Sequence, residues 1–181
     1  MSKAIVLVAA AMISVVTLLA AGCAERVTPT RPTEEPPPPA SAAPVPPAAS
    51  VFSLEAESGS GDGEIRQRSQ ASGGRTVHLG PGERRSWTFT IDSVPAQYAL
   101  AVRYSNGRYG PRELITLAVD GLRTGAFTSR DTGEDTPEGW NAFVSDNAGV
   151  SMLPAGAHTV TLDVTGGDGC VEIDLVALTP R

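Results

Sequence analysis

Cysteine and histidine are scarce in this chain of 181 residues, which contains two of each. Two cysteines are too few for a disulfide framework or a four-cysteine zinc site. The histidines, His78 and His158, lie in no pattern typical of a catalytic triad, and the chain has no Gly-x-Ser-x-Gly motif. The acidic segment 131–138 could hold the two carboxylates of a glycosidase, but its spacing does not argue for such a pair. The sequence therefore predicts that this protein is not an enzyme.

Basic residues are outnumbered by acidic ones, at 14 Lys and Arg against 20 Asp and Glu, which gives a formal net charge of −6. Because nucleic acids attract surfaces rich in Lys and Arg, this balance excludes nucleic acid as an expected partner. Hydrophobic residues make up 41% of the chain, which is typical of a globular protein.

Residues 1–22 are organised like an export signal. A short positive start at Met1–Lys3 precedes an apolar stretch at Ala4–Ala21, and Gly22 and Cys23 follow. This ending resembles a bacterial lipoprotein signal. The resemblance implies that Cys23 is the lipidated first residue of the mature chain, anchored to a bacterial cell membrane or envelope on its extracytoplasmic side. The alternative is a secretory signal or a membrane span that contains a cysteine by chance.

Residues 23–50 are expected to form a lipid-anchored linker. From Val27 to Ser50 the chain is rich in Pro, Ala, Thr and Ser, and it has no apolar periodicity from which a core could form. In a polyproline II conformation, which rises about 3.1 Å per residue, this stretch would span roughly 75 Å. One domain of about 130 residues, 51–181, remains.

The remaining domain shows the alternation of β-strands, and no stretch sustains a helical repeat. Turn sequences such as Asn106-Gly107 and Asp120-Gly121 separate the alternating runs. About eight or nine short strands of this kind predict an all-β fold, a two-sheet antiparallel β-sandwich or jelly roll. The clearest alternating residues are Trp87, Phe89 and Ile91; Tyr98, Leu100, Val102 and Tyr104; Val160, Leu162 and Val164; and Val171, Ile173 and Leu175.

Several landmarks occur in an order that resembles a carbohydrate-binding module of families six and thirty-five. The resemblance covers nearly all of residues 52–178, and it implies a galactose-binding-like β-sandwich. It also implies non-catalytic binding of a polysaccharide or envelope glycan. The landmarks are Leu54–Glu57, Ser72–Gly74, Tyr98–Gly107, Gly139-Trp140, Leu153–Val160 and Ile173–Leu175.

Two carboxylates near the start of the domain suggest a calcium site. Glu55 and Glu57 would point to the same face of one strand, where they repel each other unless water or a cation separates them. The resemblance implies a structural Ca²⁺ held by these glutamates, by carbonyl groups within 69–74 and by the late Asp174. The alternative is an exposed acidic edge strand that discourages aggregation.

The expected sugar site is centred on Trp140, since binding modules of this kind stack an aromatic ring on a sugar. Trp140 lies in a polar loop, although it could instead plug the end of the sandwich. The resemblance adds Tyr104 and Asn106 at the rim, with Tyr104 alternatively in the core. Tyr109 in the next turn is expected to be exposed, and Asp168 is a weak substitute for the family's sugar-binding asparagine.

The family's second aromatic residue is missing, because 65–70 reads Ile-Arg-Gln-Arg-Ser-Gln. Arg66 and Arg68 could instead bind the carboxylate of a uronic acid, or they could be ordinary solvated charges. We therefore expect a surface lipoprotein that binds carbohydrate through a calcium-stabilised sandwich. The alternative is a structural or protein-interaction lipoprotein that kept the sandwich and lost the sugar site.

Overall fold

The computed structural model describes residues 48–107, 112–134, 136–167 and 169–181. Within these ranges the chain forms eleven strands and two short 3-10 helices, η1 (Ala56–Ser58) and η2 (Gly139–Asn141). No helix in these ranges is long and apolar enough to cross a membrane. The expected signal peptide with Cys23 and most of the linker lie outside the described residues, as do Tyr109 and Asp168.

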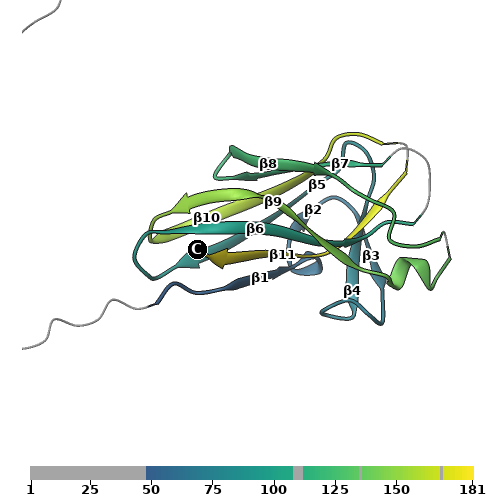
Figure 1. Cartoon of the computed structure of the whole chain (residues 1–181), viewed down its shortest axis with the longest axis horizontal. Helices are drawn as coiled ribbons and strands as arrows, with labels where there is room; N and C mark the ends of the chain where they lie inside the picture. The colour runs from purple at the N-terminus through teal and green to yellow at the C-terminus, as the bar shows by residue number, and fades with distance from the viewer. Residues whose placement is uncertain (1–47, 108–111, 135, 168) are drawn as a thin grey trace, which may run out of the picture. The chain divides into compact units, whose positions relative to one another are not determined.

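The strands form two antiparallel sheets, which confirms the predicted β-sandwich (Figure 1). The six-stranded sheet has the order β3-β4-β11-β6-β9, and β1 pairs with β11 beyond the end of β4. It contains β1 (Phe52–Glu55), β3 (Glu64–Gln67), β4 (Arg75–Leu79), β6 (Ala96–Ser105), β9 (Val144–Leu153) and β11 (Val171–Pro180). The five-stranded sheet contains, in spatial order, β2 (Ser60–Gly61), β5 (Arg84–Ile91), β10 (Gly156–Val164), β7 (Leu114–Val119) and β8 (Leu122–Thr128).

The core lies between the sheets and follows the alternation in the sequence. The inward residues of β5, β6 and β10 are buried as expected. On β11 the alternation changes at a register shift between Ile173 and Leu175, so that Val176 and Leu178 take the later inward positions. Leu175, which was expected in the core, is therefore only partly buried.

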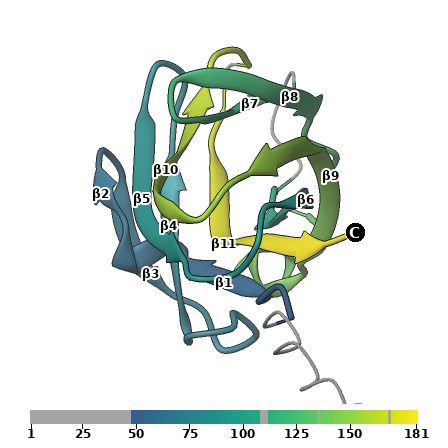
Figure 2. The same cartoon turned by 90° about the vertical axis from the view of Figure 1, so that its left-hand side faces the viewer.

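One side of the sandwich closes where β8 of one sheet lies beside β9 of the other (Figure 2). Glycines allow this approach, since a Cβ added at Gly125 would lie 2.2 Å from the carbonyl oxygen of Ala148. A larger residue at Gly125 would force the two edges apart. The close contact covers edges that could otherwise pair with another chain.

A buried histidine joins two turns at one end of the five-stranded sheet. His158, on β10, is 5% exposed. Its Nδ1 lies 2.7 Å from Oδ2 of Asp120, and its Nε2 lies 2.9 Å from the carbonyl oxygen of Pro154. Since both ring nitrogens face acceptors, both must carry protons for both bonds to form. Burial lowers the pKa of His158, but the bonds to Asp120 and Pro154 raise it by more, so the net shift is upward.

We expect His158 to stabilise the fold most below neutral pH. A histidine whose pKa rises on folding stabilises fully below its unfolded pKa of about 6.5, and it loses that contribution as pH rises through the folded value. His158→Gln should therefore lower the free energy of unfolding by about 1 kcal/mol more at pH 6 than at pH 9. Denaturant titrations at both pH values measure this difference, and an equal loss at both would contradict a protonated histidine.

Candidate functional site

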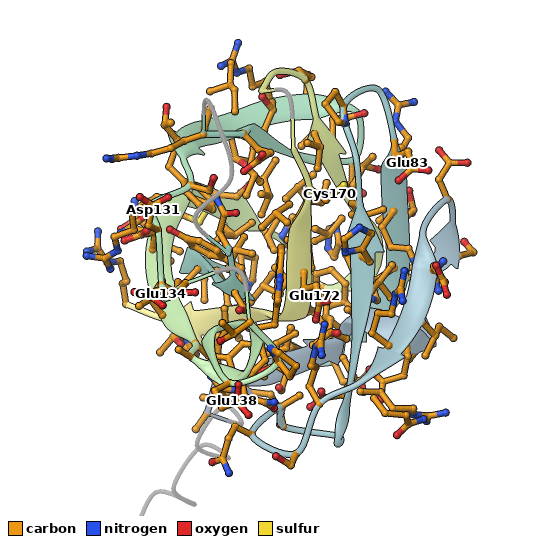
Figure 3. The ribbon with its side chains drawn as sticks, turned by 90° about the vertical axis from the view of Figure 1, so that its right-hand side faces the viewer. Glu83, Asp131, Glu134, Glu138, Cys170 and Glu172 are labelled. Carbon is orange, nitrogen blue, oxygen red and sulfur yellow. The ribbon has the colours of Figure 1, made fainter. Side chains whose placement is uncertain are left out.

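Trp140 lies on η2, the short helix that directly follows Glu138, which is labelled in Figure 3. Its indole is half-buried and packs against Gly107, where an added Cβ would lie 2.7 Å from Cε2 of the ring. The guanidinium carbon of Arg68 lies 6.0 Å from the ring centroid, and the ring of His78 lies 5.9 Å away, centroid to centroid. Trp140 therefore joins its loop to the outward face of the six-stranded sheet.

Arg68 is held by a buried carboxylate on that face. Its Nε and Nη2 donate to the two carboxylate oxygens of Glu172, at 2.7 and 2.5 Å, and Thr76 donates to the same carboxylate at 2.8 Å. Glu172, on β11, is 1% exposed. Burial alone would raise the pKa of Glu172, but the interactions with Arg68, His78 and Thr76 outweigh it and hold the pKa at about 2. Glu172 is therefore an anion at any pH of interest, and its hydrogen bond raises the pKa of Arg68.

Tyr104 and Asn106 do not reach the surface. Tyr104 is fully buried, and its hydroxyl donates to Asp146 at 2.6 Å. Burial, followed by this hydrogen bond, raises the pKa of Tyr104 to about 12. The amide of Asn106 donates to Glu113 at 2.8 Å and to Ser129 at 2.9 Å. Both residues hold the loops together from inside, and neither presents its side chain to a ligand.

Arg66 lies apart from the pair formed by Arg68 and Glu172. It is exposed on β3 and binds Glu64 across 2.7 Å. The structure therefore brings Trp140 and Arg68 together, and it leaves Arg66 as a surface ion pair. The remaining candidates for sugar contact, Tyr109 and Asp168, lie outside the described residues.

The two glutamates of the expected calcium site converge on one glycine. A Cβ added at Gly73 would lie 2.6 Å from Oε1 of Glu57 and 3.5 Å from Oε2 of Glu55. Oε1 of Glu55 accepts a hydrogen bond from Ser72, and Oε1 of Glu57 lies 3.4 Å from Nε of Arg75. The Oε2 atoms of both glutamates are buried without a hydrogen-bond partner. Buried carboxylate oxygens of this kind are costly unless a cation or a donor satisfies them.

Asp174 lies next to the two glutamates but is already occupied. Its Oδ1 accepts the backbone N–H of Ser72 at 2.8 Å, and its Oδ2 binds Arg103. Nowhere in the described ranges are three or more His, Cys, Asp or Glu residues grouped so that they could hold a metal. Any cation at Gly73 would therefore rely on Glu55, Glu57 and backbone carbonyl groups.

Arg85 and Glu172 are structurally important residues that the sequence did not single out. Arg85, on β5, is 7% exposed. It donates to the carbonyl oxygens of five residues between positions 56 and 62, which we call the β1–β2 segment. The position of Glu172 between the inward residues Val171 and Ile173 predicts that its side chain points outward. It does not predict that Arg68 would bind this side chain and bury it. The five acceptors of Arg85 are Ala56, Glu57, Gly59, Gly61 and Asp62.

No family model matches this sequence, and no curated protein matches it. Among solved structures, a family 35 carbohydrate-binding module from Clostridium thermocellum matches with a TM-score of 0.61 at 20% identity, over 74% of this chain and 100% of the module. This protein has the fold of a carbohydrate-binding module. The antiparallel β-sandwich expected from the sequence is thereby confirmed.

Two enzymes contain a region with the same fold. An exo-β-1,3-galactanase from Phanerochaete chrysosporium, in complex with β-1,3-galactotriose, matches at 25% identity with a TM-score of 0.58, over 72% of this chain and 29% of the enzyme. A β-(1,4)-mannanase from Podospora anserina that includes a family 35 module matches at 20% identity with a TM-score of 0.56. The match covers 72% of this chain and 28% of the enzyme. This chain spans less than a third of either enzyme.

Proposed function

We propose that this protein binds carbohydrate without acting on it chemically. The observation that supports the proposal is the match to the Clostridium thermocellum module, which extends over 100% of that module. Trp140 and Arg68 form the proposed site, with the indole stacking on a sugar face and the guanidinium donating to its hydroxyl groups. Of the sugar contacts expected from the sequence, these two lie close together in the structure.

A glycan array tests this function directly. We expect the protein to bind at least one polysaccharide class, and Trp140→Ala to weaken that binding about 30-fold, which corresponds to about 2 kcal/mol. Because Trp140 is half-buried, the melting temperature of each variant is measured alongside its affinity.

Tyr104→Phe serves as the matched control. It removes a buried hydroxyl that binds Asp146, so we expect a lower melting temperature with unchanged glycan affinity. If the protein binds no glycan on the array, the result would favour the alternative, a protein-interaction lipoprotein that kept the sandwich. Protein partners recovered from the cell envelope would then be the next search.

We further propose that Glu55 and Glu57 hold a structural Ca²⁺. Their two unpartnered oxygens and the bare Cα of Gly73 fit a cation that takes six to eight oxygen ligands. The ion would neutralise two buried carboxylates and fix the segment 69–74 against β1. It supplies charge and rigidity, with no chemical step.

We also propose that Cys23 carries the lipid anchor, on the resemblance of residues 1–23 to a lipoprotein signal. A lipidated amino terminus would keep the sandwich on the extracytoplasmic side of a bacterial membrane or envelope, and glycans reachable from there would be its partners. Cys23→Ser is expected to release the protein from the membrane fraction. Continued membrane association of that variant would argue for an uncleaved span instead.

A further inference from the structure

The charge next to Trp140 identifies the class of sugar that this site accepts. We infer that the site selects uncharged sugars over uronic acids, and that Glu172 sets this preference by neutralising Arg68. The inference rests on the proposed carbohydrate binding. It decides between the two roles that the sequence left open for Arg68.

The ion pair of Arg68 and Glu172 is already complete. Two nitrogens of Arg68 bind the two oxygens of Glu172, in the two-pronged geometry that a uronic acid would need for itself. A uronate that took this place would leave Glu172, which is 1% exposed, buried without its cation. Breaking a buried pair in this way is strongly unfavourable, because it leaves an uncompensated buried charge. The carboxylate of a sugar therefore gains little from Arg68.

The neighbouring loop adds negative charge. Asp131, Glu134 and Glu138 lie on the end of the sandwich that also carries Glu172 (Figure 3). The other arginine of the 65–70 segment, Arg66, binds Glu64. A uronate approaching Trp140 would meet like charges there, whereas an uncharged sugar would not.

Arg68 can still bind a hydroxyl group. A guanidinium has five N–H donors, and the bonds to Glu172 use Nε and Nη2. These bonds fix the orientation of the guanidinium beside the indole. Nη1 can then donate to a sugar hydroxyl without separating the ion pair, so Glu172 acts as a positioning residue as well as a counter-charge.

The test compares polysaccharides that differ only at the carboxylate, which reduction converts to an uncharged hydroxymethyl group. Polygalacturonate, alginate and glucuronoxylan are each compared with their carboxyl-reduced forms, in which every uronic acid becomes the neutral sugar. We expect the wild-type protein to bind the best reduced form at least tenfold more tightly than its native counterpart. Equal or tighter binding of the native forms would overturn the inference while leaving carbohydrate binding intact. No binding to any neutral or acidic glycan would overturn the proposed function itself.

The role of Glu172 is tested by Glu172→Gln, which frees the charge of Arg68. We expect the preference for the reduced form to fall about tenfold in this variant, whereas Glu64→Gln, which frees Arg66 on β3, should leave it unchanged. An unchanged preference in a folded Glu172→Gln protein would overturn the role of Glu172.

A salt series on the wild type does not depend on how the variant folds. If Arg68 is neutralised, lowering the salt concentration from 150 to 15 mM should not tighten binding of the native polyuronates. A tightening of threefold or more would indicate an unpaired cation and would overturn the assignment.

Discussion

Replacing Arg85 with methionine is expected to lower the free energy of unfolding by about 3 kcal/mol. The guanidinium donates to five carbonyl oxygens between Ala56 and Asp62, at 2.7 to 3.5 Å, and it is 7% exposed. Methionine fills similar space without any donor, so these carbonyl groups would lose their partner. Equilibrium denaturation in urea measures the loss.

The adjacent residue provides a matched control. Arg84 has an exposed side chain and pairs with Asp163 at the surface. Surface pairs contribute little, so Arg84→Met should change the free energy of unfolding by no more than about 0.5 kcal/mol. Similar losses for the two variants would contradict the role of Arg85 as the anchor of the β1–β2 segment.

Removal of calcium is expected to lower the melting temperature by about 10 °C. A ligand that binds only the folded state, at a concentration well above its dissociation constant, stabilises that state, and its removal takes this stabilisation away. The physical reason is that Glu55 and Glu57 would be left buried with an unpartnered oxygen each. Thermal unfolding with calcium and with a chelator, both at constant ionic strength, measures the shift. Magnesium should substitute poorly, because it prefers shorter and more rigid coordination.

Glu55→Gln combined with Glu57→Gln should remove the response to calcium, whereas Glu64→Gln should retain it. Glu64 is an exposed acidic residue of β3 and contributes a similar charge without facing Gly73. If the chelator leaves the melting temperature of the wild-type protein unchanged, the calcium site would be ruled out.

The sandwich was predictable because strands have a period of two. Trp87 to Ile91 and Tyr98 to Tyr104 alternate strictly, and their inward members are buried. The short strands β1, β2 and β3 were harder to predict individually, since they lie at or near sheet edges and show little alternation of burial. This accounts for eleven observed strands against the smaller number expected.

The candidate site was predictable only in part. Trp140 stood out because an aromatic residue in a polar loop needs an explanation, and the structure places it beside Arg68. Tyr104 and Asn106 were expected at the rim, but both side chains turn inward. The alternation had offered a core position for Tyr104. No local pattern indicated that the amide of Asn106 would donate to two buried acceptors, Glu113 and Ser129.

The sequence by itself determined the alternation of the longer strands, the turns between them and the separation of a proline-rich amino-terminal region from one domain. These follow from local chemistry, since alternation, glycine and proline act on their immediate neighbours. The tertiary structure decided which charges meet. Arg68 and Glu172 are 104 residues apart, and Ser72 and Asp174 are 102 apart, so each pair forms only when the sheet is assembled. The interactions with Arg68, His78 and Thr76 then outweigh burial and keep Glu172 ionised, which sets the charge that a ligand beside Trp140 would meet.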